Sequence, residues 1–395
     1  MASVAVVEPI AIQDPVAVKP AAKLMELAVN QETLLNEVAA VARVSDTRST
    51  QPILSHLLLE ASKGVLTITA TDLQRTLRSE CPAEVKTSGA ATISAQKFLN
   101  YIKLLPKGKV SLKMLANQHI QIQAGASRTR MPGRSASEFP ARPTPAKEVV
   151  QLSSRALRTV LRQSLFAVST SEDRYLLKAG LLILREDRMG MVATDGHRLS
   201  LVEMIENDVV LQGRSDTLIP RECMMDLLAL LNPSKEESVA FSQDDSSVYF
   251  RIGSRELSAR KLIGQFPNYE AIIPRDYTNS TLVRTAELMS SVQRVLEFAD
   301  ERTSGVKVQL SENNLSISSA SADRGESEES LPVSYAAPAI TIGFNGRYLV
   351  DFLKTIGADG EVRVSLKDGQ SAAVLTPERL NPDYQQNYIV MPMRI

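Results

Sequence analysis

Cysteine and histidine are scarce in this chain of 395 residues. Only two cysteines are present, Cys81 and Cys223, and they lie far apart without a CxxC spacing. This usage argues against a disulfide framework and against a zinc cluster, and it fits a reducing cytoplasm. The three histidines, His56, His119 and His197, form no HxH or HExxH pattern, so no metal site is expected.

Long apolar runs are also missing. No stretch approaches the ~18 residues that a bilayer-spanning helix requires, so no membrane segment is expected. The first 24 residues are apolar, but they contain Glu8 and Asp14, are interrupted by prolines and lack the basic start of a signal peptide. We therefore predict that residues 1–24 form a disordered extension and that the protein is cytoplasmic.

The formal net charge is zero, because 45 lysines and arginines are balanced by 45 aspartates and glutamates. Proteins that bind nucleic acid by charge alone are usually basic, so strong diffuse affinity for DNA is not expected. Any basic surface must be balanced elsewhere, and the segment DRGESEES, which begins at Asp323, is a candidate for the balancing charge.

Common catalytic motifs are absent as well. The sequence has no GxSxG nucleophile motif and no GxxxxGK[ST] or GxGxxG phosphate-binding loop. Asp195 and His197 could serve a hydrolase only together with a nucleophile that the sequence does not display. We therefore predict a protein without catalytic residues and without a cofactor.

What the sequence does contain is a pattern that occurs three times. A strand-like segment followed by a helix-like segment begins near residues 25, 148 and 280. In the second copy, apolar residues from Leu157 to Leu165 recur at i, i+3, i+4 and i+8, which is typical of an amphipathic helix. Such a repeat predicts several copies of one structural unit.

A second helix also occurs in triplicate. It lies between two strand-like segments in each copy and ends near Leu105, Leu231 and Ile356, about 125 residues apart. Alternating segments typical of strands fill the remainder. We therefore predict an α+β fold of three tandem domains, each with two helices and many strands, at residues 25–147, 148–274 and 275–395.

The turn in MVATDGHRLS, residues 191–200, combines a shared element with a local one. Thr71 and Asp72 repeat its Thr-Asp pair in the first copy, whereas residues 196–199 are particular to the second. His197 fits a histidine satisfied within a turn, or else the polar rim of a shallow pocket together with Arg198. The apolar, methionine-rich end NYIVMPMRI fits a final core strand or an adaptable binding surface, and both interpretations stay open.

Basic residues share faces on the expected helices. Arg155, Arg158 and Arg162 fall at i, i+3 and i+7, and Arg347 and Lys354 are seven residues apart. A solvated helix face is the ordinary meaning of such spacing. Three related domains could alternatively arrange these faces around one axis, where they would contact phosphates without reading bases.

These residues resemble a known family, the bacterial β sliding clamps, which are processivity subunits of the replicative DNA polymerase. The similarity runs from about Met25 to the end of the chain. It is carried by RSTQPILSHLLLE from Arg48, VATDGHRLS from Val192, FPNYEAIIP from Phe266 and the terminal YIVMPMRI.

The resemblance implies a head-to-tail homodimer whose six domains form a ring around double-stranded DNA, with helices inside and sheets outside. A ring holds DNA by topology, so weak, sequence-independent phosphate contacts suffice. A groove between the second and third domains would bind short peptide motifs from DNA polymerases, clamp-loader subunits and repair proteins.

The resemblance assigns the lining of this groove to two sets of residues. The second domain would contribute Leu177, Thr194, Gly196, His197, Arg198, Leu199, Pro267 and Ile272. The third domain would contribute Ser371, Ala373, Ile389, Met391, Pro392, Met393 and Arg394. Leu176 is an alternative to Leu177, because the segment RYLLKAGLL is one residue longer than the usual form. Apolar anchors of a partner would fill the groove, while His197, Arg198 and Arg394 would hold polar atoms of the peptide.

For DNA, the resemblance points to Arg48, Arg174 and Tyr175 in addition to the basic face of residues 155–162. Phe298 matches an apolar position of the dimer interface, and a core role for it is the alternative. A repeat scaffold that binds proteins but no DNA is the remaining rival; it would tolerate loss of the basic helix faces.

Overall fold

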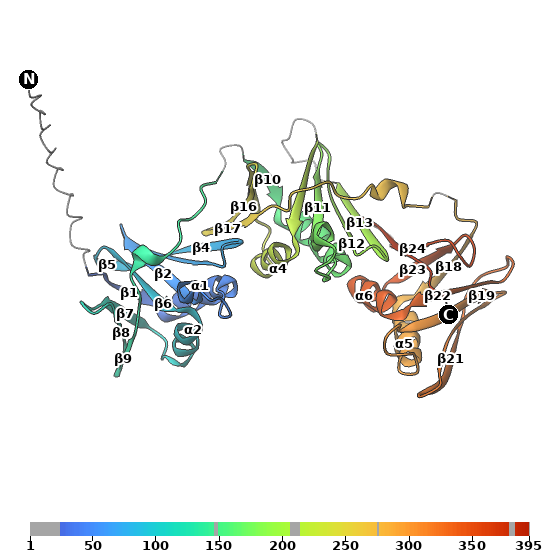
Figure 1. Ribbon diagram of the computed structural model, residues 1–395, viewed down its shortest axis with the longest axis horizontal. Helices are drawn as coiled ribbons and strands as arrows, with labels where there is room; N and C mark the ends of the chain where they lie inside the picture. The colour runs from blue at the N-terminus through green and yellow to red at the C-terminus, as the bar shows by residue number, and fades with distance from the viewer. Residues whose placement is uncertain (1–23, 146–148, 206–213, 275, 379–383, 395) are drawn as a thin grey trace, which may run out of the picture.

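The structure is a computed structural model that describes residues 24–145, 149–205, 214–274, 276–378 and 384–394. The predicted N-terminal extension, residues 1–24, lies outside the described residues except for Leu24. The chain forms three domains in an open crescent, with the helices on its concave side and strands on its convex side (Figure 1). The predicted α+β architecture of three two-helix domains is confirmed.

The first domain contains two helices and nine strands. The helices are α1 (Gln31–Val41) and α2 (Ala95–Leu104). The strands are β1 (Glu26–Asn30), β2 (His56–Ser62), β3 (Val65–Thr71), β4 (Arg75–Pro82), β5 (Glu84–Thr87), β6 (Gly89–Ser94), β7 (Lys109–Met114), β8 (Ile120–Ala124) and β9 (Ser127–Met131).

The second domain repeats this plan over its described residues. Its helices are α3 (Ser154–Ser164) and α4 (Arg221–Leu230). Its strands are β10 (Val150–Ser153), β11 (Ala179–Leu184), β12 (Arg188–Thr194), β13 (Arg198–Ile205), β14 (Ser215–Pro220), β15 (Ser238–Gln243), β16 (Ser247–Ile252) and β17 (Arg255–Arg260).

The third domain also has two helices and several strands over its described residues. Its helices are α5 (Thr285–Leu296) and α6 (Gly346–Ile356). Its strands are β18 (Asn279–Arg284), β19 (Gly305–Ser311), β20 (Asn314–Ser321), β21 (Gly325–Pro332), β22 (Ile340–Asn345), β23 (Glu361–Leu366), β24 (Ala373–Glu378) and β25 (Gln385–Val390).

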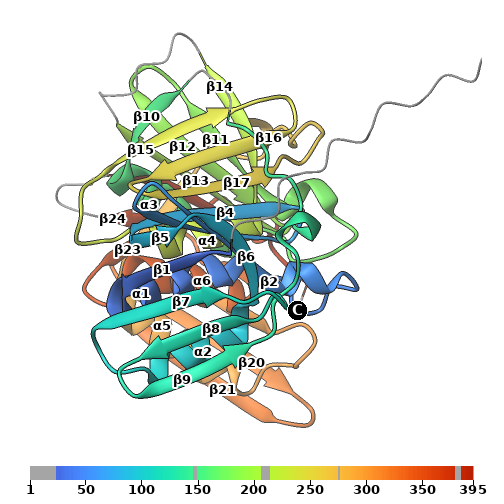
Figure 2. The ribbon, with the colours of Figure 1, turned by 90° about the vertical axis from the view of Figure 1, so that its left-hand side faces the viewer.

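Two sheets continue from one domain into the next. One eight-stranded sheet has the order β10-β15-β16-β17-β4-β3-β2-β6, and the other has the order β14-β11-β12-β13-β25-β24-β23-β18. The antiparallel pair β4–β17 therefore forms the first junction, between the first two domains, and Figure 2 shows these strands side by side. The pair β13–β25 forms the second junction.

Local sequence explains where the helices begin and which face they bury. The side chains of Asn30, Ser153 and Asn345 accept hydrogen bonds from the first turns of α1, α3 and α6 and so cap these helices. In α3 the apolar positions, such as Leu157 and Leu161, are buried against the sheet. The polar positions between them stay on the opposite face, as the helical period requires.

The core follows from the same patterns. One apolar cluster is shared by the first two domains, and a second fills the third domain. A third cluster lies at the second junction and includes Leu199, Val374 and Ile389. No helix in the described part of the chain is long and apolar enough to cross a membrane.

Candidate functional site

The turn after β12 is built by two side chains that hold its backbone. The Thr194 hydroxyl donates to the Arg198 carbonyl (2.6 Å) and accepts from the Gly196 amide (3.0 Å). The Asp195 carboxylate accepts from the His197 amide (2.9 Å) and the Arg198 amide (3.1 Å). Gly196 has φ of +87°, a conformation that favours glycine. The turn is therefore rigid and leaves its tip, Gly196 and His197, exposed.

Arg198 joins this turn to the third domain. Its guanidinium donates to Asp195 Oδ2 (2.9 Å) and to Asp351 Oδ2 of α6 (2.8 Å). It also lies over the rings of Tyr348 (4.3 Å to the centroid) and Phe166 (5.6 Å). The sequence predicts Arg198 at the polar rim of a pocket. In the structure only 10% of its side chain is exposed, so Arg198 bridges the second junction instead of forming a free rim.

Aromatic rings surround this arginine. Tyr388 stacks on Phe352 with 4.5 Å between centroids and meets Phe166 edge-on at 5.3 Å. Burial raises the pKa of the Tyr388 hydroxyl well above its ordinary value, so the phenol stays neutral and donates to the Tyr348 carbonyl (2.9 Å). Burial alone would lower the pKa of Arg198, but hydrogen bonds to Tyr388 and Asp351 and the charge of Asp195 outweigh burial and raise that pKa.

A row of side chains crosses four strands on the other face of this sheet. Strand register pairs Thr194 with Leu199, Leu199 with Ile389, and Ile389 with Val374. Paired residues point to the same face, so the four side chains form one continuous row across β12, β13, β25 and β24. This row would form the floor of the predicted groove; all four side chains are buried, and the row is apolar except for Thr194.

Ala373 does not belong to that floor, and its prediction is wrong. It is fully buried and packs in the core of the third domain, on the helix side of the sheet. Its neighbour Val374 occupies the groove side instead. Successive residues of a strand face opposite sides, so an alignment error of one residue exchanges the two faces.

Two segments border the floor. Leu177, in the short 3₁₀ helix at Tyr175–Lys178, has its Cδ1 atom 3.9 Å from where a Cβ of Gly196 would lie, which favours Leu177 over Leu176 as the residue at this turn. Pro267 is exposed and Ile272 is half-buried. Both lie on a segment that Phe266 and Tyr269 anchor in the third apolar cluster, at the second junction.

Ser371 lies in the turn before β24. Its amide and its hydroxyl donate to the Asp368 carboxylate, at 2.6 and 2.9 Å, and these bonds shape the turn. The side chain is half-buried beside Ala372, which packs against the third apolar cluster at the second junction. Ser371 therefore flanks the row and does not form part of it.

The C-terminal residues diverge after β25. The Met391 amide donates to the His197 carbonyl (2.9 Å), which extends the β13–β25 ladder by one residue to the turn. The Met393 amide instead donates to the Gly343 carbonyl (2.9 Å), and its methyl group lies near Gly305. Met391 is 36% exposed beside the groove, Pro392 is half-buried and Arg394 is exposed.

Arg174 lies on this turn as well. Its guanidinium donates to the Asp195 carbonyl and contacts His197 Nε2 (3.3 Å). The resemblance assigns Arg174 to DNA, and in the structure the side chain covers Gly196. His197 is thus held through its ring by Arg174 and through its carbonyl by Met391, which fits a histidine satisfied within a turn. The interpretation as a pocket rim stays a prediction.

The remaining DNA candidates lie at the surface. Arg48 is exposed in the loop before β2, and Tyr175 is 58% exposed. On α3, Arg155 and Arg162 are exposed and Arg158 is half-buried, so the three share the predicted solvent face. Helix α3, which carries them, lies on the concave side of the crescent.

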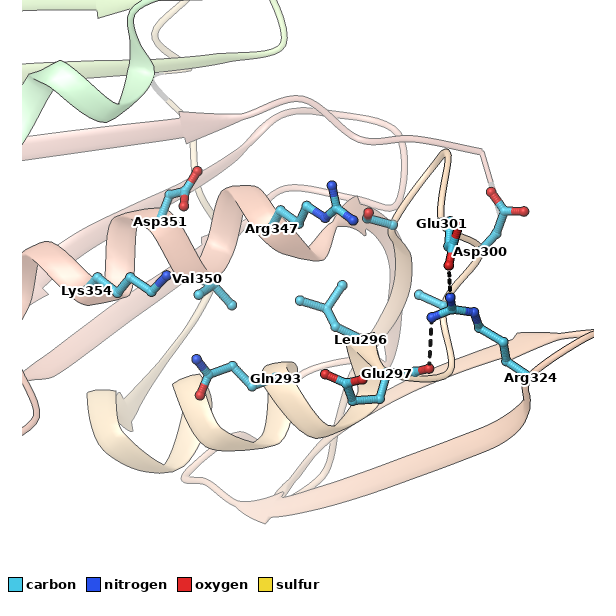
Figure 3. A pocket seen from close by; sticks show the side chains of 12 residues that line it. Gln293, Leu296, Glu297, Asp300, Glu301, Arg324, Arg347, Val350, Asp351 and Lys354 are labelled. Carbon is cyan, nitrogen blue, oxygen red and sulfur yellow. Dashed lines mark hydrogen bonds and ion pairs between the residues drawn. The ribbon is translucent and has the colours of Figure 1, made fainter.

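The groove between α5 and α6 shows the mixed charge of the concave side. Arg347 and Lys354 project from α6, and Gln293 and Glu297 project from α5 (Figure 3). At one end Arg324 donates to Glu301 and to the Glu297 carbonyl. The two cations on α6 thus share one face, as their spacing predicts. Among the described residues no group of three or more His, Cys, Asp or Glu side chains could hold a metal ion.

Phe298 lies just beyond α5 and is 36% exposed. It is not part of the third domain's core cluster, and its ring lies near Gly325 at the start of β21. This location fits the interface interpretation better than the core interpretation.

Sequence reasoning missed the partners of Arg198. Asp351 is the sixth residue of α6, and Asp226 is the sixth residue of α4, where it accepts from Arg75 (2.6 Å) of the first domain. Alignment of the two helices would have revealed both aspartates, and alignment of the two Thr-Asp turns would have revealed both arginines.

Comparison with known proteins matches all three domains of the chain to one protein family. Three family models match, described as the N-terminal, central and C-terminal domains of the DNA polymerase III beta subunit, at residues 25–143, 151–268 and 270–394. The chain belongs to this family. Beta sliding clamps of Synechococcus elongatus and Pseudomonas aeruginosa are each 30% identical to it, and each alignment covers 94% of this chain and all of the relative.

Solved structures agree with this family. A sliding clamp of Pseudomonas aeruginosa bound to griselimycin has a TM-score of 0.87 at 29% identity, and the match covers 94% of this chain and all of the other. A Bartonella birtlesii clamp has a TM-score of 0.87 at 27% identity, with the same coverage. The predicted family, the role in DNA replication and the absence of catalysis are confirmed: members are non-catalytic processivity factors of DNA polymerase III.

Proposed function

We propose that two copies of this chain close head to tail into a ring around double-stranded DNA. The supporting observation is a pair of open sheet edges. Strands β4 and β13 follow equivalent Thr-Asp turns, and each pairs with the last strand of the next domain, β17 or β25. Over the residues that the structure describes, the equivalent strands β21 and β9 lie at the ends of their sheets, each paired on one side only. Pairing of β21 with β9 of a second copy would repeat the two junctions a third time.

Charge on these two edges supports the same pairing. Strand β21 carries Glu326 and Glu328, whereas the exposed side chains of β9 include Arg128 and Arg130. Opposite charges directly across an antiparallel pair are favourable, and like charges are not. Phe298, exposed beside the start of β21, would supply an apolar contact at the same interface.

In such a ring the concave helices would face the DNA. Arg155, Arg158 and Arg162 would meet phosphates without reading bases, and the neutral net charge would keep these contacts weak enough for sliding. Arg48 and Tyr175 complete the proposed contacts, and Arg174 is placed nearer the groove. A role on chromosomal DNA would place the protein in the cytoplasm.

We further propose that the groove at the second junction binds peptide motifs of DNA polymerases and clamp-loader subunits. Its floor is the row Thr194, Leu199, Ile389 and Val374, and Leu177, Pro267, Ile272 and Met391 border it. An apolar row beside the exposed turn tip, Gly196 and His197, suits a short segment with apolar anchors, which would part the bordering side chains to reach the buried row. The domain boundaries 25–147, 148–274 and 275–395 stay part of this proposal.

Retention on DNA tests the ring. Purified protein is loaded on nicked circular DNA by a cognate clamp loader with ATP, and the circle is then linearised. We expect retention on the circle and loss from the linear form, because only topological linkage distinguishes the two. Equal loss from both forms would favour the repeat scaffold that binds no DNA.

Two variants separate the two proposed surfaces. Replacement of Arg155, Arg158 and Arg162 by glutamate should weaken loading while peptide binding persists. Deletion of Met391–Ile395 should abolish peptide binding without unfolding the chain, as circular dichroism would report. Normal peptide affinity after this truncation would refute the groove assignment.

A further inference from the structure

A second groove lies at the first junction, built from the same elements as the groove at the second. It encloses about 610 Å³ between the turn after β3, residues 140–143 of the interdomain segment, and strands β16 and β17. The chain repeats its domain, so the two junctions can be compared atom by atom.

The turns of the two junctions match. The Thr71 hydroxyl donates to the Arg75 carbonyl (2.8 Å) and accepts from the Leu73 amide (3.1 Å), as Thr194 does at the second junction. The Asp72 carboxylate accepts from the amides of Gln74 (2.9 Å) and Arg75 (2.6 Å). Beyond the turn, the Arg260 amide donates to the Gln74 carbonyl (2.8 Å), as Met391 does to His197. Arg260 therefore occupies the place of Met391.

The floors of the two grooves differ in chemistry. Strand register pairs Thr71 with Thr76, Thr76 with Ser258, and Ser258 with Tyr249. This row is the counterpart of Thr194, Leu199, Ile389 and Val374. Hydroxyl groups thus replace three aliphatic side chains. Thr76 donates to Thr71 (3.0 Å) and Tyr249 donates to Asp244 (2.8 Å), so among the lining residues it is Ser258, whose hydroxyl makes only a 3.5 Å contact, that can offer a hydrogen bond to a ligand.

Exposed apolar side chains stand at the edges of this floor. Leu73, Tyr175 and Ile263 line the groove and are 41%, 58% and 81% exposed. Leu73 has φ of +72°, at the position where the second junction has Gly196. A leucine in this conformation is strained, and such strain is found at binding sites more often than elsewhere.

The charged residues of the groove are all basic. Arg142, Arg260 and Lys261 line it, and no aspartate or glutamate does so. In the described part of the chain none of these three side chains forms an ion pair. Asp244 and Asp245 lie close enough to act on Lys261, but Asp244 accepts hydrogen bonds from Ser246, Ser247 and Tyr249 and forms no ion pair with Lys261. An anionic ligand would therefore find three cations without breaking an ion pair.

We infer that the groove at the first junction is a docking site for an acidic peptide segment with aliphatic anchors. Leu73 and Ile263 would contact the aliphatic side chains, Arg142, Arg260 and Lys261 would pair with the carboxylates, and the Ser258 hydroxyl would bind the peptide backbone. Aliphatic side chains stack poorly with bases, so two exposed aliphatic anchors favour a peptide over a nucleic acid strand. The inference goes beyond the groove at the second junction and does not depend on it.

Fluorescence anisotropy of the labelled peptide EELSEIEE on the full chain tests this inference. We expect binding that weakens with salt, and no binding of the matched basic peptide KKLSKIKK. Leu73→Gly should weaken binding about tenfold, because it removes an anchor. Glycine adopts the positive φ without strain, so this variant should keep its unfolding temperature.

Charge variants provide the second arm. Reversal of two groove cations, Arg260→Glu with Lys261→Glu, should also weaken binding about tenfold or more. The control Lys235→Glu with Lys367→Glu makes the same change in net charge at exposed sites outside the groove and should leave affinity unchanged. Deletion of Met391–Ile395 should leave affinity unchanged as well, which separates this site from the second junction.

Three results would overturn the inference. One is the absence of any anisotropy change with EELSEIEE up to millimolar protein. Another is equal affinity of the wild type, Leu73→Gly and the double charge reversal. The third is tighter binding of a short oligothymidylate with the same dependence on Leu73, because the groove would then bind a nucleic acid strand.

Discussion

The two domain junctions share a framework and differ in what they expose. At each, a Thr-Asp turn holds an arginine that reaches the sixth residue of a helix in the next domain: Arg75 contacts Asp226 at 2.6 Å, and Arg198 contacts Asp351 at 2.8 Å. Yet the row beside the turn is Thr-Thr-Ser-Tyr at the first junction and Thr-Leu-Ile-Val at the second. The framework sets the geometry, and the row sets the chemistry.

The ties that reinforce the two junctions also differ. At the first, Glu37 of α1 accepts two hydrogen bonds from Arg255 of β17, at 2.8 and 3.0 Å. At the second, Gln386 donates to the Gln163 carbonyl (2.9 Å) and to Ser200 (3.1 Å), which is a neutral network. Charge therefore reinforces the first junction, whereas neutral hydrogen bonds and aromatic packing reinforce the second.

The open edges lack the arginine–aspartate bridge. The sixth residue of α2 is Asn100, where α4 and α6 have aspartate. Arg324, near the tip of the β20–β21 hairpin, pairs with Glu301 of its own domain. If two copies close as proposed, their interface would be the one without this bridge, and so the weaker place in the ring.

The largest expected effect comes from the bridging arginines. Arg75→Ala and Arg198→Ala should each lower the free energy of unfolding by about 3 kcal/mol, because each leaves carboxylates without their partner. Urea unfolding of these two variants is compared with that of the control Arg251→Ala, which removes an ion pair whose arginine side chain is 62% exposed. The control should lose less than ~1 kcal/mol. A small effect at only one junction would show that the bridges are not equivalent.

The rows should respond unequally to small changes. Ile389→Val should cost about 1 kcal/mol, because it removes a methylene from a fully buried side chain. Its counterpart Ser258→Ala should stay within ~0.5 kcal/mol, because its hydroxyl makes only a 3.5 Å contact. Urea midpoints of both variants give the comparison, and equal losses would contradict the difference in floor chemistry.

The turn tips form a matched pair. Gly196→Ala should cost about 1 kcal/mol, because alanine resists φ of +87°, and the Arg174 guanidinium that covers this glycine would have to move. Leu73→Gly should change stability by less than ~1 kcal/mol, since relief of strain offsets the lost leucine. Thermal unfolding compares the two; a destabilised Leu73→Gly would mean that Leu73 packs as a core residue.

The smallest effect concerns pH at the first junction. Burial alone would raise the pKa of Glu37, but hydrogen bonds from Arg255 and Ser79 outweigh it and lower the pKa below its ordinary value. The stability that Glu37 contributes is therefore present above its unfolded pKa of about 4.5 and is lost as pH falls below it. Glu37→Gln should flatten this acid loss in unfolding curves between pH 6 and pH 3, and an unchanged slope would assign the loss to other groups.

Periodicity along the chain was enough for the domain plan. The helix ends expected near Leu105, Leu231 and Ile356 agree with α2, α4 and α6. These predictions succeed because amphipathic spacing reports which face of a helix is buried. The groove residues around Thr194 and Ile389 came from resemblance, and Ala373 failed because a shift of one residue reverses the face of a strand.

Local spacing along the chain encodes the number of domains, their class and the turn that each junction uses. Tertiary structure, in contrast, buries Arg198 between two carboxylates and two rings. It also directs Val374 and not Ala373 toward the groove side of the sheet, and it brings Leu73, Tyr175 and Ile263 to one groove. These facts depend on pairing between strands far apart in the chain, and no local pattern specifies which strands pair.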